Sequence, residues 1–507
     1  MQLFQCIHLG LVRGIWVAIY AASVASAAAQ FEVNVAAMTP PAPMREFRGV
    51  WVSSVGESSW LLRTGTDVVA QKAELIAIMD RAELLKLNAV IFQVRPQCDA
   101  LYESRHEPWS EFLTGTMGRA PQPFFDPLKF AVEEAHKRGL ELHAWFNPYR
   151  ALHHSSKSPI AANHISKTRP ELVHSYGRYL WLDPGEPAVR DHIINVMLDV
   201  VRRYDVDGVH IDDYFYPDPI RGADGSVADF PDDGSWKRFG AGGKLSRDDW
   251  RRENVNKLIE RLYRSIQSAK PWVKFGVSPH GIWRPGNPPQ IQGSDNYSTI
   301  YADSRKWLAN GWLDYCAPQL YWSIDSKGQS FPVLLRWWSD QNPKSRHLWP
   351  GLNSHKVGSD WKSDEIVNQV RVTRKQPGVS GHIHWNMSRL MPGQSGLGEA
   401  LQRQVYSQPA LIPAMSWKPG SAPSTPKLTV KALGDDVFRA EWSAAGTNKV
   451  WQWVLQTRKG NQWTTEILPA QTVSRQWRLP SLEAIAVTAV DRVGRTSPPR
   501  VYQVLRR

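Results

Sequence analysis

The segment Asp207-Gly208-Val209-His210-Ile211-Asp212-Asp213-Tyr214 carries the clearest chemical signal in the sequence, because a short apolar run ends there in two adjacent carboxylates. Side chains alternate along a strand, so His210 and Asp212 share one face and Asp213 starts on the other. A buried carboxylate is costly unless it is paired or has a function. We therefore expect Asp212 to be catalytic, unless it belongs to a satisfied polar network. We expect Asp213 either to be catalytic or to cap the following loop.

Cleavage of a glycosidic bond normally requires a second carboxyl group across the bond, which acts as a nucleophile or activates water. The candidates near other predicted strands are Asp99, Glu103, Glu107 and Asp314. Asp314 precedes its strand, and this position favours a structural role. We expect Asp99 to be the second catalytic carboxylate; its alternative is a salt bridge to Arg95 or Arg150.

These residues need a scaffold, and from residue 45 to residue 410 the chain alternates apolar runs with amphipathic helical segments, a pattern typical of a parallel sheet. The pattern predicts an α/β fold, a (β/α)8 TIM barrel over residues 45–410. The helical segments include 68–86, 127–138, 187–204 and 250–269. The eight predicted strands are Phe47–Val55, Ala89–Arg95, Glu141–Asn147, Gly208–Tyr214, Lys274–Pro279, Tyr315–Trp322, His347–Leu352 and Gly381–Trp385.

Barrel enzymes place their chemistry in the loops that follow the C-terminal ends of the strands. Asn and Arg donate hydrogen bonds of fixed geometry to hydroxyl and carboxylate oxygens, and Trp rings offer flat apolar faces for stacking on sugars. The alternative for these residues is packing between strand ends or in the core. The predicted substrate-binding residues are Arg95, His143, Asn147, Tyr149, Arg150, His210, Tyr214, His280, Trp283, Gln319, Tyr321, Trp322, Asn353 and Trp385.

The sequences before and after the predicted barrel have different patterns. Residues 1–29 combine one Arg, an apolar run and a stretch of small residues. This pattern predicts a cleaved signal peptide and an exported protein, periplasmic or extracellular. An uncleaved membrane anchor is the alternative. Residues 30–44 are a Pro-rich lead-in and residues 411–424 a Pro- and Ser-rich linker. Short alternating runs over residues 425–507 predict a small all-β sandwich, and the run Ala486–Pro498 resembles the closing hairpin of fibronectin type III modules.

The composition limits the classes of partner. With 42% hydrophobic and 21% charged residues, the 507-residue chain is typical of globular proteins. Its 24 Trp residues exceed what packing usually needs, and its three Cys exclude a disulfide scaffold or a Cys-rich metal site. A net charge of +13 favours anionic polymers. The Lys and Arg residues are scattered and form no recognised nucleic-acid module, so we expect no nucleic-acid partner.

Several longer motifs occur together between residues 44 and 400. They are Arg45-Glu46-Phe47-Arg48-Gly49-Val50-Trp51-Val52, Phe92-Gln93-Val94-Arg95-Pro96, Asp99-Ala100-Leu101-Tyr102, Glu107-Pro108-Trp109-Ser110, Asp126-Pro127-Leu128, Asn147-Pro148-Tyr149-Arg150, Asp212-Asp213-Tyr214 and Ala317-Pro318-Gln319-Leu320-Tyr321. As a set, they resemble the glycosyl-hydrolase-like family 10 proteins, bacterial exported barrels that include divisome-localised hydrolases of peptidoglycan glycan strands. The resemblance implies a barrel that acts on a glycan, with the aspartates of the fourth strand as its site.

These observations predict an exported glycoside hydrolase that cleaves a cell-wall glycan, with peptidoglycan strands as the expected polymer and the C-terminal module as a contact for wall or divisome proteins. A non-catalytic carbohydrate-binding protein on a barrel scaffold is the alternative, since a barrel fold does not guarantee catalysis. A metal-dependent deacetylase would need a third ligand beside His210 and Asp212, so we expect no metal and no cofactor. The sequence carries no signal for the oligomeric state.

Overall fold

The computed structural model describes residues 38–504 apart from residues 57, 58, 63, 66, 223 and 435. The predicted signal peptide, residues 1–29, therefore lies outside the described residues. Within the described part of the chain, no helix is both long enough and apolar enough to cross a bilayer.

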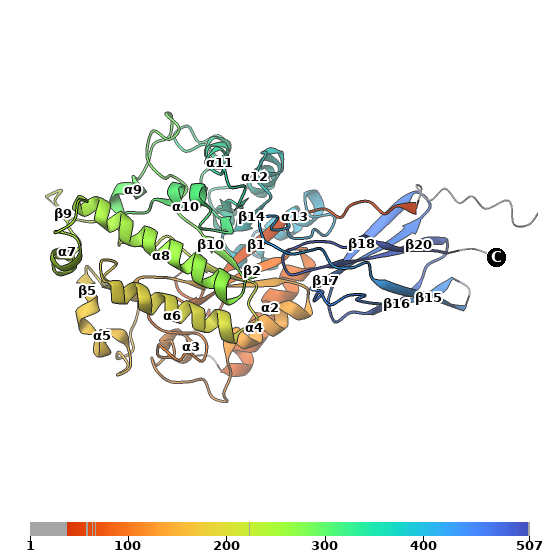
Figure 1. Cartoon of the computed structure of the whole chain (residues 1–507), viewed down its shortest axis with the longest axis horizontal. Helices are drawn as coiled ribbons and strands as arrows, with labels where there is room; N and C mark the ends of the chain where they lie inside the picture. The colour runs from red at the N-terminus through yellow and green to blue at the C-terminus, as the bar shows by residue number, and fades with distance from the viewer. Residues whose placement is uncertain are drawn as a thin grey trace, which may run out of the picture.

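A curled sheet of nine parallel strands forms the centre of the main domain (Figure 1). The strand order is β12-β11-β10-β7-β3-β2-β1-β14-β13. Residues 347–352 contain both end strands and pair with β11 through their first half and with β14 through their second half, so the two ends of this order meet. The strands are β1 (Phe47–Val52), β2 (Ala89–Arg95), β3 (Glu141–Phe146), β7 (Gly208–Ile211), β10 (Lys274–Val277), β11 (Tyr315–Cys316), β12 (His347–Leu348), β13 (Gly351–Leu352) and β14 (Gly381–His384).

The mixed α/β class is confirmed, and each of the eight predicted runs contains a strand. Alternate strand residues pack on one another in one cluster, which includes Ile91 and Trp145 and in which the rings of Phe47 and Trp349 stack at 3.6 Å. The intervening residues, such as Val90, pack against the helices in a second, larger cluster. The strands are thus buried on both faces, and this explains their nearly continuous apolar sequences.

Helices connect successive strands and begin at the positions that their capping residues indicate. The side chains of Asp67, Asp126 and Ser246 accept hydrogen bonds from backbone N–H groups in the first turns of α2, α4 and α8. The helices are α2 (Val68–Leu84), α3 (Glu111–Thr114), α4 (Pro127–Lys137), α5 (Ile165–Thr168), α6 (Pro187–Arg203), α7 (Asp233–Phe239), α8 (Arg247–Ala269), α9 (Asn296–Thr299), α10 (Ser304–Asn310), α11 (Phe331–Asp340), α12 (Ser363–Lys375) and α13 (Leu397–Gln404). Short 3-10 turns occupy Pro170–Leu172, Ser354–Lys356 and Met387–Leu390.

The two longest connections carry small sheets of their own. After β3, the strands β4 (Arg150–Leu152), β5 (Val173–Tyr176) and β6 (Tyr179–Leu182) form a three-stranded antiparallel sheet. After β7, the strands β8 (Ile220–Arg221) and β9 (Val227–Ala228) form a hairpin. Figure 1 shows β5, β9, α5 and α7 gathered at the end of the molecule opposite the C-terminal strands.

The C-terminal segment is all β and consists of two antiparallel sheets. One has the order β15-β16-β19 and the other β18-β17-β20-β21. Their inner side chains, including Trp442, Trp453 and Ile485, form a separate apolar core. The strands are β15 (Lys427–Gly434), β16 (Val437–Ser443), β17 (Gln452–Lys459), β18 (Gln462–Pro469), β19 (Ser474–Arg478), β20 (Leu482–Val490) and β21 (Arg500–Gln503).

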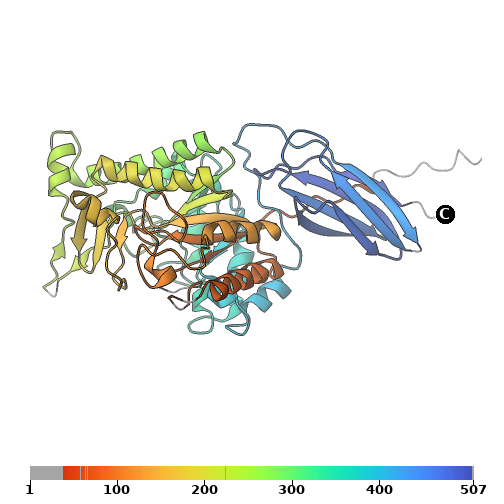
Figure 2. The same ribbon diagram turned by 90° about the horizontal axis from the view of Figure 1, so that it is seen from below.

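This C-terminal module packs against the N-terminal edge of the curled sheet (Figures 1 and 2). Arg492 pairs with Asp207, directly before β7, at 2.5 Å, and Gln452 donates to the carbonyl of Gly139, just before β3, at 2.7 Å. Burial alone would raise the pKa of Asp207, but the charges of Arg492 and His136 outweigh it and hold the pKa well below its usual range.

The predicted linker also contacts this edge of the sheet. The Lys418 ammonium lies 2.7 Å from Asp314 Oδ1, directly before β11, and the Trp417 indole donates to the same oxygen at 2.9 Å. Leu411 and Met415 are buried. The segment is therefore packed against the main domain along part of its length.

Candidate active site

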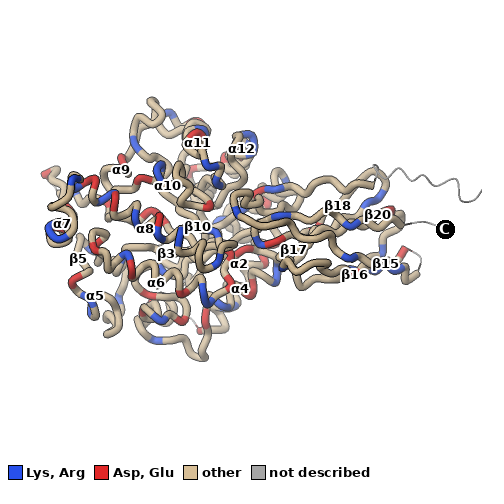
Figure 3. The backbone as a smooth tube through the Cα atoms, in the orientation of Figure 1, with Lys and Arg blue, Asp and Glu red and all other residues tan. Residues whose placement is uncertain are grey.

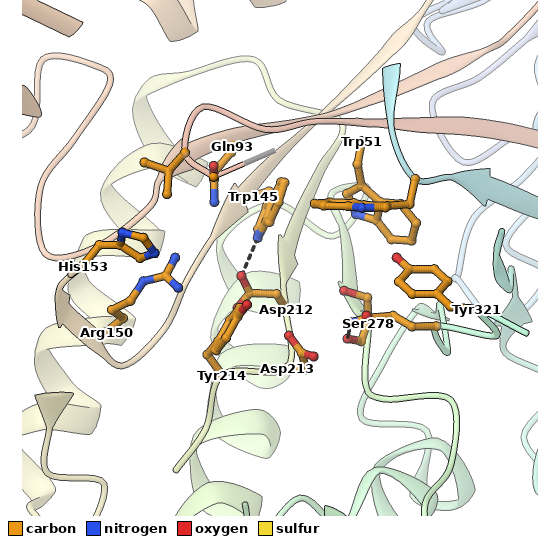
Figure 4. Close-up of a pocket in the computed structure, with 14 residues that line it drawn as sticks. Trp51, Gln93, Trp145, Arg150, His153, Asp212, Asp213, Tyr214, Ser278 and Tyr321 are labelled. Atoms are coloured by element: carbon orange, nitrogen blue, oxygen red, sulfur yellow. Dashed lines mark hydrogen bonds between the residues drawn. The ribbon is translucent and has the colours of Figure 1, made fainter. Parts of the chain in front are cut away.

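A cavity of about 300 Å³ opens at the C-terminal edge of the curled sheet (Figure 4). Every one of its walls comes from a residue near the end of a central strand or from the loop that follows one. It is lined by Trp51, Val55, Gly56, Gln93, Trp145, Arg150, His153, Asp212, Asp213, Tyr214, Ser278, Gln319, Tyr321 and Trp385.

Asp212 lies deep in this cavity, directly after β7. Its Oδ2 accepts a hydrogen bond from Trp145 Nε1 at 2.9 Å and one from Asn147 Nδ2 at 3.4 Å. Its Oδ1 is buried and has no hydrogen-bond partner among the described residues. Burial, together with the neighbouring charge of Asp213, raises the pKa of Asp212 to about 7. Asp212 can therefore exchange a proton near neutral pH.

Asp213 is the more open of the two carboxylates. Its Oδ2 lies 3.0 Å from Nε2 of His280, and the two side chains are 11% and 37% exposed. Asp218 does not line the cavity. Partial burial of its carboxyl group raises its pKa, and the charges of His280 and Asp213 act on that pKa in opposite directions. The adjacent aspartates thus differ in environment, one enclosed among indole and amide donors and the other beside an imidazole at the rim.

Three indole rings form an apolar wall next to Asp212. Trp385 makes edge-to-face contacts with Trp51 and Trp145, each with ring centroids 6.0 Å apart. Figure 4 shows the Trp145 indole directed at Asp212, with the Trp51 ring on one flank of the opening. Flat apolar faces beside hydrogen-bonding groups suit a sugar ring, which has both kinds of surface.

Arg150 supplies positive charge on the opposite flank from Trp51 (Figure 4). Its guanidinium donates from Nε and Nη2 to the carbonyl of Pro96 at 3.0 and 2.8 Å, and it lies 4.7 Å from the centre of the Tyr214 ring. Burial and the Arg150 charge lower the pKa of the neighbouring His153 to about 3. This flank therefore presents one fixed cation and a neutral imidazole.

Beneath the cavity, the imidazole of His210 forms hydrogen bonds with two residues that line the cavity, Trp51 and Ser278. Nε2 of His210 accepts from the Trp51 indole N–H at 3.2 Å and lies 2.9 Å from the Ser278 hydroxyl. Burial lowers the pKa of His210 well below its usual value. Because an indole N–H can only donate, Nε2 carries no proton, and Nδ1–H of the neutral ring donates to the Tyr315 hydroxyl at 3.0 Å.

From His210, a chain of hydrogen bonds runs through the interior of the sheet to Glu141. The Tyr315 hydroxyl donates to Nδ1 of His143 at 2.9 Å, and Nε2–H of His143 donates to Glu141 at 3.0 Å. Glu141 in turn pairs with the Lys274 ammonium at 2.7 Å. A Cβ atom at Gly276 would lie 2.0 Å from the Tyr315 ring, so glycine makes room for this buried chain. The chain fixes the orientations of the Trp51 and Ser278 side chains.

The structure brings nine of the 17 predicted site residues to the cavity or into contact with its carboxylates. Arg150, Asp212, Asp213, Tyr214, Gln319, Tyr321 and Trp385 line the cavity. Asn147 and His280 do not line it, but they contact the two aspartates directly.

Asp99, the predicted second catalytic carboxylate, does not reach the cavity. It is fully buried, and its Oδ2 accepts from Gln97 Nε2 at 2.8 Å. Burial raises its pKa to about 7. The salt bridge considered for it is not formed either, because Arg95 pairs with Glu107 at 2.6 Å.

The other predicted binding residues lie elsewhere. His143, Tyr149 and His210 are fully buried in the domain interior. Trp283 stacks on Trp337 with ring centroids 6.0 Å apart. Arg95, Trp322 and Asn353 also do not line the cavity.

Five lining residues with functional side chains were not predicted: Trp51, Gln93, Trp145, His153 and Ser278. Trp145 precedes Asn147 by two positions and so shares its strand face, a signal that could have identified it. Among the described residues, no group of three or more His, Cys, Asp or Glu side chains is placed to hold a metal ion.

Comparisons with known proteins identify relatives of this chain. The glycosyl hydrolase-like 10 family profile matches residues 46–368. Glycosyl hydrolase YngK of Bacillus subtilis is 40% identical over 412 residues, which cover 79% of each chain. Glycosyl hydrolase DigH of Escherichia coli K12 is 35% identical over 379 residues, which cover 68% of this chain and 84% of DigH.

Solved structures with related folds are much more distant. The PgaB glycoside hydrolase domain of Bordetella bronchiseptica is 12% identical with a TM-score of 0.47, over 71% of this chain and 98% of that one. The catalytic domain of β-amylase from Paenibacillus polymyxa is also 12% identical with a TM-score of 0.47, over 72% and 99% of the two chains. The extent of the profile match and the identity to two curated relatives decide the family. The chain belongs to the glycosyl hydrolase-like 10 family, and a function of the glycoside hydrolase type is supported.

Proposed function

We propose that the protein is an exported glycoside hydrolase that cleaves glycosidic bonds in a cell-wall glycan, with peptidoglycan strands as the polymer. The observation that carries this proposal is a cavity at the C-terminal edge of the sheet that contains Asp212 and Asp213 beside three indole rings. We further propose that the curled sheet is a (β/α)8 barrel in which residues 347–352 act as one strand. In such barrels, this edge is where catalysis takes place.

Two neighbouring carboxylates can serve a glycosidic bond, one by transferring a proton to and from its oxygen and the other by accepting a hydrogen bond from the sugar. Asp212 has a pKa of about 7, so its charged form, which accepts hydrogen bonds, is accessible at neutral pH. Arg150 and His153 line one flank and Tyr321 the other, where they can bind hydroxyl groups of the sugars (Figure 4). The cavity thus offers acid–base chemistry, an apolar wall and hydrogen-bonding groups together.

The polymer and the location are proposed from the sequence. Residues 1–29 have the features of a secretory signal, and the net charge of +13 favours anionic polymers such as wall glycans. Figure 3 shows Lys and Arg interspersed with Asp and Glu along the chain, so this attraction is a property of the whole molecule. The C-terminal module, which lies at the opposite edge from the cavity, would attach the chain to the wall or to a divisome protein.

The test is release of reducing ends from purified wall glycan by the wild type, by Asp212→Asn and by a matched control, Asp99→Asn. Both aspartates are buried and both have a pKa raised to about 7, but only Asp212 lines the cavity. We expect release by the wild type and by Asp99→Asn, and none by Asp212→Asn. Equal activity of all three would reject Asp212 as a catalytic group.

One observation favours the alternative of a carbohydrate-binding protein. Among the described residues that line the cavity, the only carboxylates are Asp212 and Asp213, and they are adjacent in the sequence. A protein of this kind would bind wall glycan in sedimentation assays and release no product in either the wild type or Asp212→Asn. Product from the wild type excludes it.

A further inference from the structure

The arrangement of the carboxylates does not suit the common two-carboxylate mechanism. That mechanism places one carboxyl group on each side of the scissile bond, about 5–5.5 Å apart for retention or about 6.5–9.5 Å apart for inversion. Asp212 and Asp213 are consecutive residues directly after β7, and Figure 4 shows both on one side of the opening. Two groups on the same side cannot flank a sugar ring.

The remaining walls offer no replacement among the described residues. The other functional side chains of the lining are indole, phenol, amide and hydroxyl groups, with Arg150 and His153 on one flank. None of these is a carboxylate, and the Ser278 hydroxyl lies 2.9 Å from an imidazole nitrogen of His210. The imidazole nitrogen beside Ser278 already accepts the Trp51 indole N–H. No described lining residue thus supplies a carboxylate nucleophile opposite Asp212 and Asp213.

We propose that the substrate supplies the nucleophile: the carbonyl oxygen of a 2-acetamido group on the sugar attacks C1, so the enzyme requires a 2-acetamido-2-deoxy glycoside. This inference rests on the proposed glycoside hydrolase function and narrows its substrate class. In this mechanism one carboxyl group transfers the proton and a neighbouring carboxylate accepts a hydrogen bond from the acetamide N–H. Both groups lie on the same side of the sugar ring, as Asp212 and Asp213 do in the structure.

The bonds and protons balance in two steps. In the first, the acetamide oxygen bonds to C1, the glycosidic C1–O bond breaks, and the leaving oxygen takes a proton from one carboxyl group, while the other carboxylate accepts the hydrogen bond of the amide N–H. In the second, water attacks C1 from the opposite face and gives a proton to the first carboxylate, now charged, and the bond between C1 and the acetamide oxygen breaks. The amide is restored and the configuration at C1 is retained.

The different surroundings of the two aspartates indicate which one accepts the amide N–H and which one transfers the proton. Asp212 is the acceptor for the amide N–H, because its Oδ1 is buried without a partner and its Oδ2 is anchored by Trp145 and Asn147. The indole wall beside it would contact the acetamide methyl group. Asp213 is the acid and base, because it lies at the rim, where the leaving chain departs, and it contacts His280, which is 37% exposed to solvent.

Chemically altered glycan tests the substrate requirement. Purified wall glycan without stem peptides is offered to the full-length protein in three forms: native, de-N-acetylated, and re-N-acetylated after that treatment. We expect the native and re-N-acetylated forms to be cleaved and the de-N-acetylated form to be cleaved at least 100-fold more slowly. Comparable cleavage of all three forms would overturn the inference and leave the hydrolase function intact. Failure to cleave any form would overturn the proposed function, and the inference with it.

Variants test the assignment of the two tasks. An aryl 2-acetamido glycoside with a dinitrophenolate leaving group needs no protonation, so we expect Asp213→Asn to recover most of its lost rate on this substrate and Asp212→Asn not to recover. A thiazoline analogue of the cyclised sugar should bind the wild type and Asp213→Asn, and it should bind Asp212→Asn at least tenfold more weakly. Recovery of Asp212→Asn alone would reverse the two roles and contradict the assignment.

Two further variants test whether a protein carboxylate is the nucleophile after all. Asp218 is a further carboxylate whose pKa is influenced by the charges of His280 and Asp213, and Glu57, which lies outside the described residues, follows the cavity-lining Gly56 in the sequence. We expect Asp218→Asn and Glu57→Gln to keep activity within about threefold of the wild type. A loss of 1000-fold or more in either variant, with unchanged unfolding, would identify a nucleophile in the protein and overturn the inference.

Discussion

The Asp212→Asn substitution should make the protein more stable at alkaline pH while it removes catalysis. In the folded protein the pKa of Asp212 is about 7, whereas the ordinary value is 3.8. Since one pKa unit corresponds to about 1.36 kcal/mol, the charged form of Asp212 costs up to about 4 kcal/mol of folding free energy above pH 7. Asparagine has a similar shape, can accept from the Trp145 indole and carries no charge, so it removes this cost.

The sign of the pH dependence follows from proton binding. Between about pH 4 and pH 7 the folded protein holds a proton on Asp212 that the unfolded chain has lost, so this residue lowers stability as the pH rises through that interval. Below pH 4 both states are protonated and the substitution should have little effect. At pH 8 we expect Asp212→Asn to be more stable than the wild type by roughly 1–4 kcal/mol, because part of the shift comes from Asp213.

Urea unfolding of both proteins at pH 4 and pH 8, followed by fluorescence, measures this difference. Asp325→Asn, a substitution at an exposed position, is the control and should unfold like the wild type at both pH values. A stability difference between the wild type and Asp212→Asn that is the same at both pH values would refute the assigned environment. So would destabilisation by the substitution at pH 8.

Three further predictions concern residues outside the cavity. Asp99→Asn should keep glycan cleavage within about threefold of the wild type, and a loss like that of a catalytic variant would return this residue to the site. Arg492→Ala leaves Asp207 buried without its main partner and should cost about 2–4 kcal/mol in urea unfolding, whereas Arg439→Ala in an exposed ion pair should cost less than about 1 kcal/mol; equal losses would contradict the docking described. Tyr315→Phe removes the hydroxyl that joins two buried imidazoles and should cost about 1–3 kcal/mol and weaken substrate binding, seen as a higher KM; unchanged unfolding and kinetics would show that the buried chain has no positioning role.

The sequence was sufficient for the strands and for Asp212 because both depend on local periodicity. The predicted runs are buried on both faces and read as apolar throughout, and the parity of the strand that begins at Gly208 places Asp212 on the inner face. The carboxylate comes directly after the strand, at the edge where parallel sheets carry their functional residues. No long-range information was needed for this step.

The alternation of side chains along β2 did not identify its site residues correctly. Its pairing with β3 shifts register between Gln93 and Arg95, so the residues beyond the shift no longer follow the alternation. Gln93 lines the cavity, while Arg95 is held by Glu107 and Asp99 by Gln97. A register shift depends on the partner strand, and one sequence read alone does not reveal it.

The predictions for the aromatic residues were only partly correct, for a different reason. Trp283 and Trp385 both follow predicted strands, but one packs on Trp337 and the other lines the cavity. The large apolar area of tryptophan suits either place, and the tertiary neighbours decide between them. The contact of the linker with Asp314 is also tertiary, since Lys418 lies about a hundred positions away in the sequence.

The position of the C-terminal module has a consequence for how the chain could work on an insoluble meshwork. The module is fastened to residues that precede β3, β7 and β11, and the cavity lies past the other ends of the same strands. A partner bound to the module would therefore lie on the side of the domain opposite the cavity. A tethered chain would reach only strands that lie a full domain away from its point of attachment, and it would leave the material it is fixed to uncut.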